Sequence, residues 1–175
     1  MIFTIGHSTL PIEKFLEMLE AHGIQQLVDV RTIPKSRRNP QFGQDQLPVL
    51  LRQQGIRYLH LAGLGGLWHA RKDSINTGWK NASFRGYADY MQTPAFAENL
   101  TKLIEVAGAG PTAIMCAEAV PWRCHRSLIA DALAAREIEV EHILSATSRK
   151  SHSYTPFVRV EGDSVTYPGL PRTES

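Results

Sequence analysis

The sequence predicts an α/β protein, a three-layer α/β/α arrangement with a mainly parallel sheet of about five strands and a C-terminal β-hairpin. Short apolar runs alternate along the chain with segments whose apolar residues recur at helical spacing. Several of the apolar runs are continuous, which is typical of parallel strands buried on both faces. Strands that alternate with helices imply right-handed crossovers, with helices on both faces of the sheet.

The strands are predicted where apolar and β-branched residues run together. These segments are 2–5, 26–31, 57–61, 112–116 and 139–144. The strand at 57–61 contains Tyr58 and His60 at alternate positions, so one of its faces is expected to be polar. His60 is expected to be a core histidine with its hydrogen bonds satisfied. The strand at 26–31 carries Asp29 and Arg31 at its carboxyl end, which indicates the rim of the sheet.

The helices are predicted from apolar spacing together with proline near their starts and glycine near their ends. They cover residues 11–23, 45–55, 84–92, 94–108 and a segment around 128–133. Asp45 is expected to cap the second helix. Ser8 or Thr9 is a candidate cap for the first, and Ser8 is equally a candidate ligand contact.

The connections differ in character. Residues 33–43 form an irregular basic segment, and residues 62–83 form a long connection that carries several glycines. Loops of that length inside a compact domain are usually functional or disordered. Residues 145–155 are predicted to be a polar linker, and residues 157–167 a hairpin that turns at Gly162 and Asp163, followed by a frayed tail.

Length and composition limit the class of protein. With 175 residues, 43% of them hydrophobic and 21% charged, the chain is expected to be one globular domain, residues 1–175, with its core at about 2–145 and the linker, hairpin and tail at 146–175. No apolar run approaches the roughly 20 residues that cross a bilayer, so no membrane partner is expected. The start of the sequence resembles a first strand rather than a leader, which favours a cytoplasmic location.

Positive charge is concentrated locally although the net charge is only +2. Arg31, Lys35, Arg37 and Arg38 lie close together in the sequence, and Arg123 and Arg126 belong to a second basic segment. Guanidinium groups bind phosphate or carboxylate through paired hydrogen bonds. The pattern predicts an anionic ligand, with a solvated basic loop as the alternative.

The segment from 112 to 126 is the strongest candidate for a site, because an apolar strand there gives way to a loop with reactive side chains and then to a helix. Ligands of open α/β sheets bind at the carboxyl ends of strands and at helix N-termini. Together with the turn after the first strand, the loop supplies the candidate catalytic residues His7, Cys116, Glu118 and His125. The candidate ligand-binding residues are Ser8, Asp29, Arg31, Arg37, Tyr87, Arg123, Cys124 and Arg126.

Three kinds of chemistry compete for that loop. A phosphatase-type cradle would place an arginine after a five-residue loop that follows Cys116, but Arg123 comes later and Pro121 removes a donor. A zinc site would use the two cysteines with histidines, in a spacing unlike the usual paired ligands. The third assigns Glu118 as acid, base or polar anchor beside an anion held by the basic residues.

Structural roles remain open beside these functional ones. Cys116 is also a candidate for a small buried residue of the strand. For the two cysteines together, three alternatives remain open: a reduced thiol pair, a metal site and a regulatory disulfide. Asp29 is either a ligand contact or the partner of an internal ion pair. Gly6 is expected to let the backbone approach a ligand. Tyr87 either forms an aromatic wall for a base or sugar, or belongs to the core.

Four separated motifs resemble a bacterial family named domain of unknown function 488. They are Thr4-Ile-Gly-His-Ser-Thr9, Leu27-Val-Asp-Val-Arg31 with Pro34 and Ser36, Phe84-Arg-Gly-Tyr-Ala-Asp-Tyr90, and Met115-Cys-Ala-Glu118 followed by Cys124-His-Arg126. They span about residues 2–145 and occur in the family's order. The resemblance implies a compact three-layer α/β domain with these motifs gathered at one site, and it implies no particular activity.

We therefore expect an enzyme, a hydrolase or transferase, that acts on a phosphorylated or nucleotide-like substrate; hydrolysis of an N-glycosidic bond is a narrower version of this hypothesis. The alternative is a binding module for nucleic acid or a nucleotide, in which residues 33–43 and 62–83 hold backbone phosphates. A metal- or thiol-dependent site in the cysteine loop is a further alternative. The sequence names no cofactor.

Overall fold

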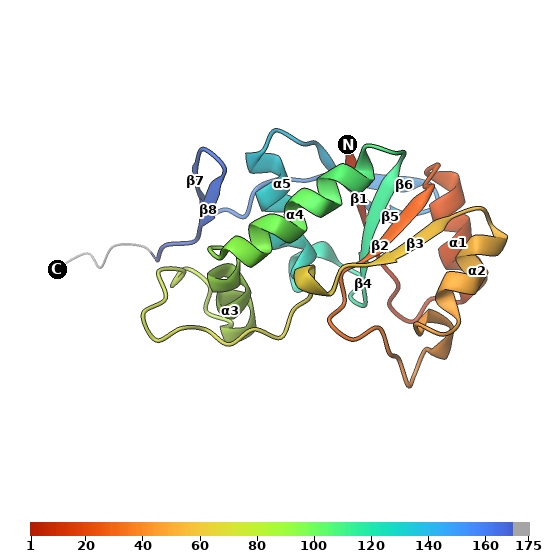
Figure 1. Ribbon diagram of the computed structural model, residues 1–175, viewed down its shortest axis with the longest axis horizontal. Helices are drawn as coiled ribbons and strands as arrows, with labels where there is room; N and C mark the ends of the chain where they lie inside the picture. The colour runs from red at the N-terminus through yellow and green to blue at the C-terminus, as the bar shows by residue number, and fades with distance from the viewer. Residues whose placement is uncertain (170–175) are drawn as a thin grey trace.

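In the computed structural model, which describes residues 1–169, one mixed sheet lies between two layers of helices (Figure 1). The order of its six strands is β3-β2-β4-β1-β5-β6, and β7 and β8 form a separate two-stranded hairpin. The strands are β1 (Ile2–Gly6), β2 (Gln26–Asp29), β3 (Arg57–His60), β4 (Thr112–Cys116), β5 (Val140–Ser145), β6 (Ser148–Ser151), β7 (Arg159–Glu161) and β8 (Ser164–Thr166). The predicted α/β class, mainly parallel sheet and C-terminal hairpin are confirmed.

The pairing of β1 and β4 at the centre of the sheet places the ends of distant segments together. β1 is parallel to both β4 and β5, and β2 is parallel to both β3 and β4. The pairing of β1 with β4 continues past Gly6, since the amides of His7 and Ser8 donate to the carbonyls of Cys116 and Ala117 at 3.0 and 2.8 Å. The carboxyl ends of β1, β2 and β4 therefore meet at one edge.

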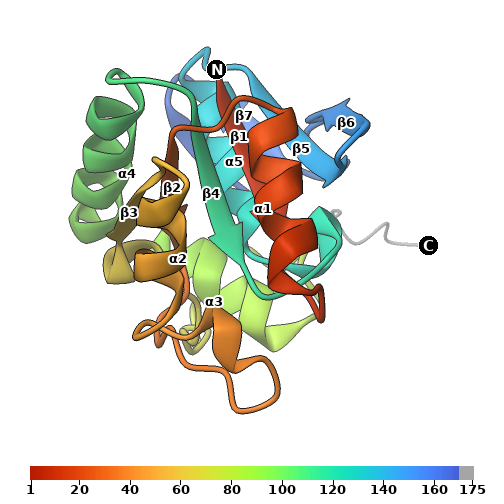
Figure 2. The ribbon, with the colours of Figure 1, turned by 90° about the vertical axis from the view of Figure 1, so that its right-hand side faces the viewer.

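Helices cover both faces of the sheet (Figure 2). They are α1 (Ile12–Ala21), α2 (Leu47–Gln53), α3 (Ala82–Tyr90), α4 (Pro94–Ala107) and α5 (Arg126–Ala135). Because side chains alternate along a strand, Phe3 and Ile5 of β1 pack with α1 and α2, whereas Ile2 packs in the other core with α3, α4 and α5. No helix among residues 1–169 is long and apolar enough to cross a membrane.

The helix starts overturn the predicted caps and confirm a predicted proline. The residue before α1 is Pro11, with no side-chain cap, so neither Ser8 nor Thr9 caps that helix. Gln46 precedes α2 without a side-chain cap, so the prediction for Asp45 is also wrong. α4 begins with proline at its first turn, as predicted, and ends at Ala107 beside Gly108.

The segment predicted as a polar linker contains a strand. Residues 148–151 form β6, antiparallel to β5, with all four residues exposed. This strand lacks any apolar alternation because it is an edge strand with no core to face. Farther on, Tyr167 is fully buried and its hydroxyl donates to Asp131 of α5 at 2.7 Å, so the chain after the hairpin belongs to the core. The predicted frayed tail lies beyond residue 169, outside the described residues.

The long connection between β3 and α3 is hydrogen-bonded to one carboxylate, Asp89. Asp89 of α3 accepts hydrogen bonds from the Arg71 amide at 2.8 Å, the Ser74 hydroxyl at 2.5 Å and the Asn76 side chain at 2.8 Å. Asn76 in turn accepts from the Tyr167 amide at 2.9 Å. These bonds tie the connection to the end of the described chain, and its two ends, near residues 66 and 82, lie beside the carboxyl edge of the sheet.

Candidate functional site

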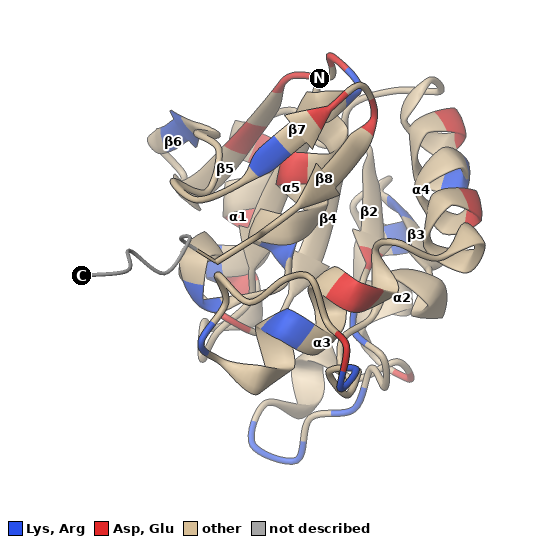
Figure 3. Cartoon of the chain, turned by 90° about the vertical axis from the view of Figure 1, so that its left-hand side faces the viewer, with Lys and Arg blue, Asp and Glu red and all other residues tan. Residues whose placement is uncertain are grey.

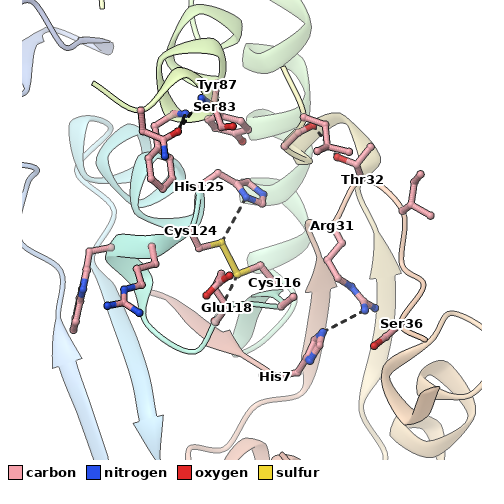
Figure 4. A pocket seen from close by; sticks show the side chains of 18 of the residues that line it. His7, Arg31, Thr32, Ser36, Ser83, Tyr87, Cys116, Glu118, Cys124 and His125 are labelled. Carbon is pink, nitrogen blue, oxygen red and sulfur yellow. Dashed lines mark hydrogen bonds between the residues drawn. A yellow bond between two sulfur atoms is a disulfide. The ribbon is translucent and has the colours of Figure 1, made fainter. Parts of the chain in front are cut away.

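A cavity of about 640 Å³ opens at the carboxyl edge of the sheet, between the ends of β1, β2 and β4 and the starts of α3 and α5 (Figure 4). Its lining comprises His7, Arg31, Thr32, Ile33, Lys35, Ser36, Gly66, Leu67, Asn81, Ser83, Phe84, Tyr87, Cys116, Ala117, Glu118, Trp122, Arg123, Cys124 and His125. All four residues predicted to be catalytic lie here. Of those predicted to bind ligand, Arg31, Tyr87, Arg123 and Cys124 lie here as well.

Asp29 and Arg31 form a buried ion pair beneath the cavity wall. Nε and Nη2 of Arg31 donate to the two carboxylate oxygens of Asp29 at 2.9 and 2.7 Å. Asp29 also accepts from the Tyr58 hydroxyl at 2.6 Å, and burial together with this bond raises the pKa of Tyr58. Of the two roles that the sequence left open for Asp29, the structure therefore shows the internal ion pair. Because Asp29 binds Nε and Nη2, Nη1 is the main guanidinium nitrogen of Arg31 that remains for the cavity.

His7 lies against that free nitrogen. Its Nδ1 is 2.8 Å from the Ser8 carbonyl, which fixes the proton on Nδ1 and leaves Nε2 as an acceptor, 3.4 Å from Nη1 of Arg31. Its ring stacks on Phe42 with centroids 4.3 Å apart. Burial, with the Arg31 charge, lowers the pKa of His7, so the ring is neutral at pH 7. His7 presents an acceptor that Arg31 already occupies.

His125 lies between Cys124 and the backbone of Val30, and its ring is neutral. Nε2 lies 2.9 Å from the Val30 carbonyl and donates to it, so Nδ1 faces the Cys124 sulfur at 3.5 Å. Its ring packs against Tyr87 with centroids 5.0 Å apart. Burial lowers the pKa of His125 to about 4, so this histidine carries no charge at neutral pH.

Cys116 and Cys124 are joined as a disulfide across the floor of the cavity (Figure 4). Cys116 ends β4, and Cys124 stands just before α5; both residues are buried. This pairing corresponds to the disulfide among the alternatives that the sequence left open. Tyr87 is buried in the core and yet borders the cavity, so its two predicted roles coexist.

Arg126 holds the site loop from the inside and does not line the cavity. It is fully buried, with Nη2 donating to the carbonyls of Glu118 and Ala119 at 3.0 and 3.4 Å and Nη1 donating to Thr4 at 3.3 Å. Burial lowers the pKa of Arg126 to about 10, which keeps it protonated at neutral pH. Arg126 has no access to an anion in the cavity, because it is fully buried and its Nη groups donate to two loop carbonyls and to the Thr4 hydroxyl.

Other predicted site residues lie beside the cavity. Ser8 lines a separate hollow between β5 and α1, and Arg37 lines a hollow next to the cavity, sharing Lys35 and Ser36 with it. A side chain on Gly6 would collide with the Glu118 carbonyl. Gly6 thus admits the site loop and not a ligand, which corrects the prediction.

Sequence reasoning missed the apolar rim of the cavity. Ile33, Leu67 and Trp122 line it while 59, 81 and 63% exposed. Large apolar side chains left in water often mark a binding surface, and a tryptophan inside a charged loop was the signal that pointed to it. Asn81 and Ser83 also line the cavity, and nothing in the sequence apart from the length of their loop indicated them.

The residues proposed for a zinc site do not form a cluster of metal ligands. No group of three or more His, Cys, Asp and Glu side chains that could hold a metal ion occurs within residues 1–169. His7, the histidine proposed to complete the set, faces Arg31.

Comparison with known proteins identifies a family and nothing narrower. The sequence profile of a family described as "Domain of unknown function DUF488" matches residues 11–133, which include the cavity-lining residues from Arg31 to His125 but not His7. No curated protein and no solved structure matches. Because the match covers more than half of the 175 residues, the chain belongs to the family of domain of unknown function DUF488.

Proposed function

We propose that this protein is an enzyme that acts on a phosphorylated or nucleotide-like substrate bound in the cavity. One observation carries the proposal: the cavity combines an exposed carboxylate, Glu118, with exposed cations and an apolar rim. Its volume of about 640 Å³ is in the range of small-molecule sites.

The anionic end of such a substrate is assigned to Lys35 and Arg123. Both are exposed, both line the cavity, and neither forms an ion pair with any residue in the described part of the chain. Arg31 contributes one nitrogen, since Asp29 holds the rest of its guanidinium. The hydroxyl of Ser36 adds a neutral donor at the same wall.

The lining of the cavity also suits a flat ring. Phe84 and Trp122 provide aromatic surface and Leu67 aliphatic surface. A nucleobase stacks on such side chains whatever its sequence identity, because every base has a π face. A phosphate held by cations and a base held by aromatic faces together describe a nucleotide.

Glu118 is the group proposed to handle the proton. Both histidines of the cavity are neutral and their ring nitrogens already contact Arg31, Cys124 or a backbone carbonyl, whereas the Glu118 side chain is exposed and has no ion-pair partner within residues 1–169. A carboxylate placed beside a bound substrate activates water as a general base. Hydrolysis of the bond between base and sugar is one reaction that needs only this carboxylate and positioning.

Glu118→Gln tests the proposal. A thermal-shift screen with nucleotides and sugar phosphates first identifies a ligand, since binding to the native state raises the melting temperature. With that ligand, Glu118→Gln is expected to keep affinity within about threefold and to lower turnover by about 100-fold or more. Glu98→Gln, on the exposed side of α4, is the matched control and should change neither. Full turnover in Glu118→Gln would refute the role of this carboxylate.

Binding of nucleic acid without turnover is the second candidate, favoured by the basic loop at one side of the cavity. Lys35, Arg37 and Arg38 are all exposed there, and Figure 3 shows further Lys and Arg on α3 and the loops around it. In this case affinity for single-stranded oligonucleotides should fall steeply with salt. Arg37→Ala with Arg38→Ala should reduce that slope by about 0.7 for each phosphate that the protein no longer neutralises. Glu118→Gln should then have little effect.

A further inference from the structure

We propose that Cys116 and Cys124 are a redox-active couple that undergoes thiol–disulfide exchange with anionic low-molecular-weight disulfides, with Cys124 as the attacking sulfur. The inference rests on the two cysteines and their surroundings and is independent of the reaction proposed for Glu118.

The position of the pair admits small reagents and excludes large ones. Both cysteines line the cavity but are only 2 and 5% exposed, so contact with them is limited to a reagent small enough to enter it. The disulfide connects the end of β4 to Cys124, which precedes the N-cap residue of α5, His125. It spans the base of a loop that Arg126 already holds through the carbonyls of Glu118 and Ala119. The fold therefore has another means of keeping the loop in place when the disulfide is open.

The two sulfurs have opposite electrostatic surroundings. The amide of Arg126 points at Cys124 Sγ at 3.4 Å, and Cys124 stands at the N-terminus of the ten-residue helix α5. Backbone N–H groups and the helix dipole at this end stabilise a thiolate. Cys116 Sγ instead lies 3.8 Å from the Glu118 carbonyl, an acceptor that favours a protonated thiol. This asymmetry assigns attack to Cys124 and resolution to Cys116.

His125 also contacts the attacking sulfur. With its proton on Nε2, donated to the Val30 carbonyl, its Nδ1 lies 3.5 Å from Cys124 Sγ and accepts a hydrogen bond from the protonated thiol when the pair is reduced. Because the low pKa of His125 keeps the ring neutral, water in the cavity takes the proton when the thiol ionises.

The exchange balances in two steps. The Cys124 thiolate attacks one sulfur of a disulfide R–S–S–R; that S–S bond breaks, one R–S⁻ leaves with the electron pair, and a Cys124–S–R bond forms. Cys116, having lost its proton to water, then attacks Cys124 Sγ and expels the second R–S⁻. The two released thiolates take up the two protons that the cysteines lost. The protein dithiol is oxidised by two electrons, and R–S–S–R is reduced to two thiols.

The charge of the cavity sets the class of reagent. Lys35 and Arg123 line the cavity without an ion-pair partner in residues 1–169, and these two cations outnumber its one exposed carboxylate, Glu118, so the cavity attracts an anion. Glutathione disulfide, which carries several carboxylates, is the probe of this class, and the uncharged disulfide of 2-mercaptoethanol is its neutral counterpart.

The test follows the two cysteines of the unmodified protein by alkylation and mass spectrometry in glutathione buffers of graded redox ratio. The expected result is a reversible change between dithiol and disulfide, with a transient glutathione adduct on the peptide that contains Cys124. Cys116→Ala should accumulate that adduct, and Cys124→Ala should not. Circular dichroism checks that each variant is folded, and the measurement on the unmodified protein stands without either variant.

Charge is tested separately with Lys35→Gln and Arg123→Gln. At low ionic strength the double variant should react about tenfold more slowly with glutathione disulfide and at an unchanged rate with the neutral disulfide. A bond that stays closed in excess glutathione, thiols that stay reduced in excess glutathione disulfide, or an adduct confined to Cys116 would overturn the proposal. The effect of Glu118→Gln on turnover tests only the proposed enzyme, and thiol–disulfide exchange tests only the redox couple. Either proposal can therefore be refuted without the other.

Discussion

Replacing Asp29 with asparagine removes the only carboxylate that faces the Arg31 guanidinium within residues 1–169, while preserving the shape of the side chain. Asp29 is fully buried and Arg31 nearly so, and the carboxylate accepts from Nε, Nη2 and the backbone amide of Arg31 as well as from Tyr58. An asparagine amide group placed there would point N–H donors at other donors. The guanidinium would remain buried without a counter-charge.

The cost of removing one partner of a buried pair is about 3–5 kcal/mol. For a chain of this size each kcal/mol corresponds to about 2–4 °C, so the melting temperature of Asp29→Asn is expected to fall by about 6–20 °C. Urea unfolding, followed through the fluorescence of the three tryptophans, gives the free energy directly. Asp45→Asn, at an exposed position, is the control and should change stability by less than about 0.5 kcal/mol. A decrease below about 1 kcal/mol in Asp29→Asn would refute the electrostatic account of this wall.

Three further predictions test the loop, the long connection and the buried histidines. Gly6→Ala should destabilise the fold by about 1–3 kcal/mol in urea, because its Cβ would collide with the Glu118 carbonyl. Asp89→Asn should make the 62–83 connection more sensitive to trypsin. The new amide nitrogen would be a donor facing the donors that now bind the Asp89 carboxylate, so some of these hydrogen bonds would be lost. Burial lowers the pKa of His125 to about 4 and that of His142 to about 3. Since the unfolded chain binds these protons near pH 6.5, stability is expected to be full above pH 6.5 and to fall between about pH 6.5 and 4, by up to about 1.4 kcal/mol per pH unit for each histidine.

Each of these has a matched control. At Gly66 a Cβ would meet the nearest atom of His125 at 3.6 Å, an ordinary contact, so Gly66→Ala should be tolerated. Asp73→Asn removes an exposed ion pair with Arg71 and should leave the tryptic pattern unchanged. The control for the pH dependence is His69→Gln, at an exposed position. This variant should retain the whole acid-induced decrease in stability. A stability that does not change from pH 7 to 5 would contradict the buried neutral state of the two histidines.

The predictable parts of the fold were those with a regular apolar pattern and clear end signals. β4 coincides with the predicted strand at 112–116, and α4 with a helix led by Pro94. Strand β6 was missed, since residues 148–151 are all exposed and no burial pattern marks them. Caps at Ser8, Thr9 and Asp45 were predicted from residue type alone, whereas the backbone enters α1 and α2 without using those side chains.

For the site, parallel strands explain what was predictable. Strands that run in the same direction end at the same edge, so residues at the ends of β1, β2 and β4 were expected to converge, and His7, Arg31 and Cys116 line one cavity. Which side chain of a charged loop faces in or out depends on packing, which has no local signature. Arg123 and Arg126 are three residues apart, yet the first is exposed at the opening and the second is fully buried.

The sequence by itself therefore determined the α/β class, the order of the main elements as far as β5 and the edge at which chemistry is expected, because apolar periodicity is a local property of the chain and strands that alternate with helices run parallel. Only the tertiary structure decided that Asp29 neutralises Arg31, that Arg126 supports the loop from within, and that the long connection brings Asn81 and Ser83 to the cavity. These outcomes depend on tertiary contacts, where burial and the need of buried polar groups for hydrogen-bond partners select one arrangement among many.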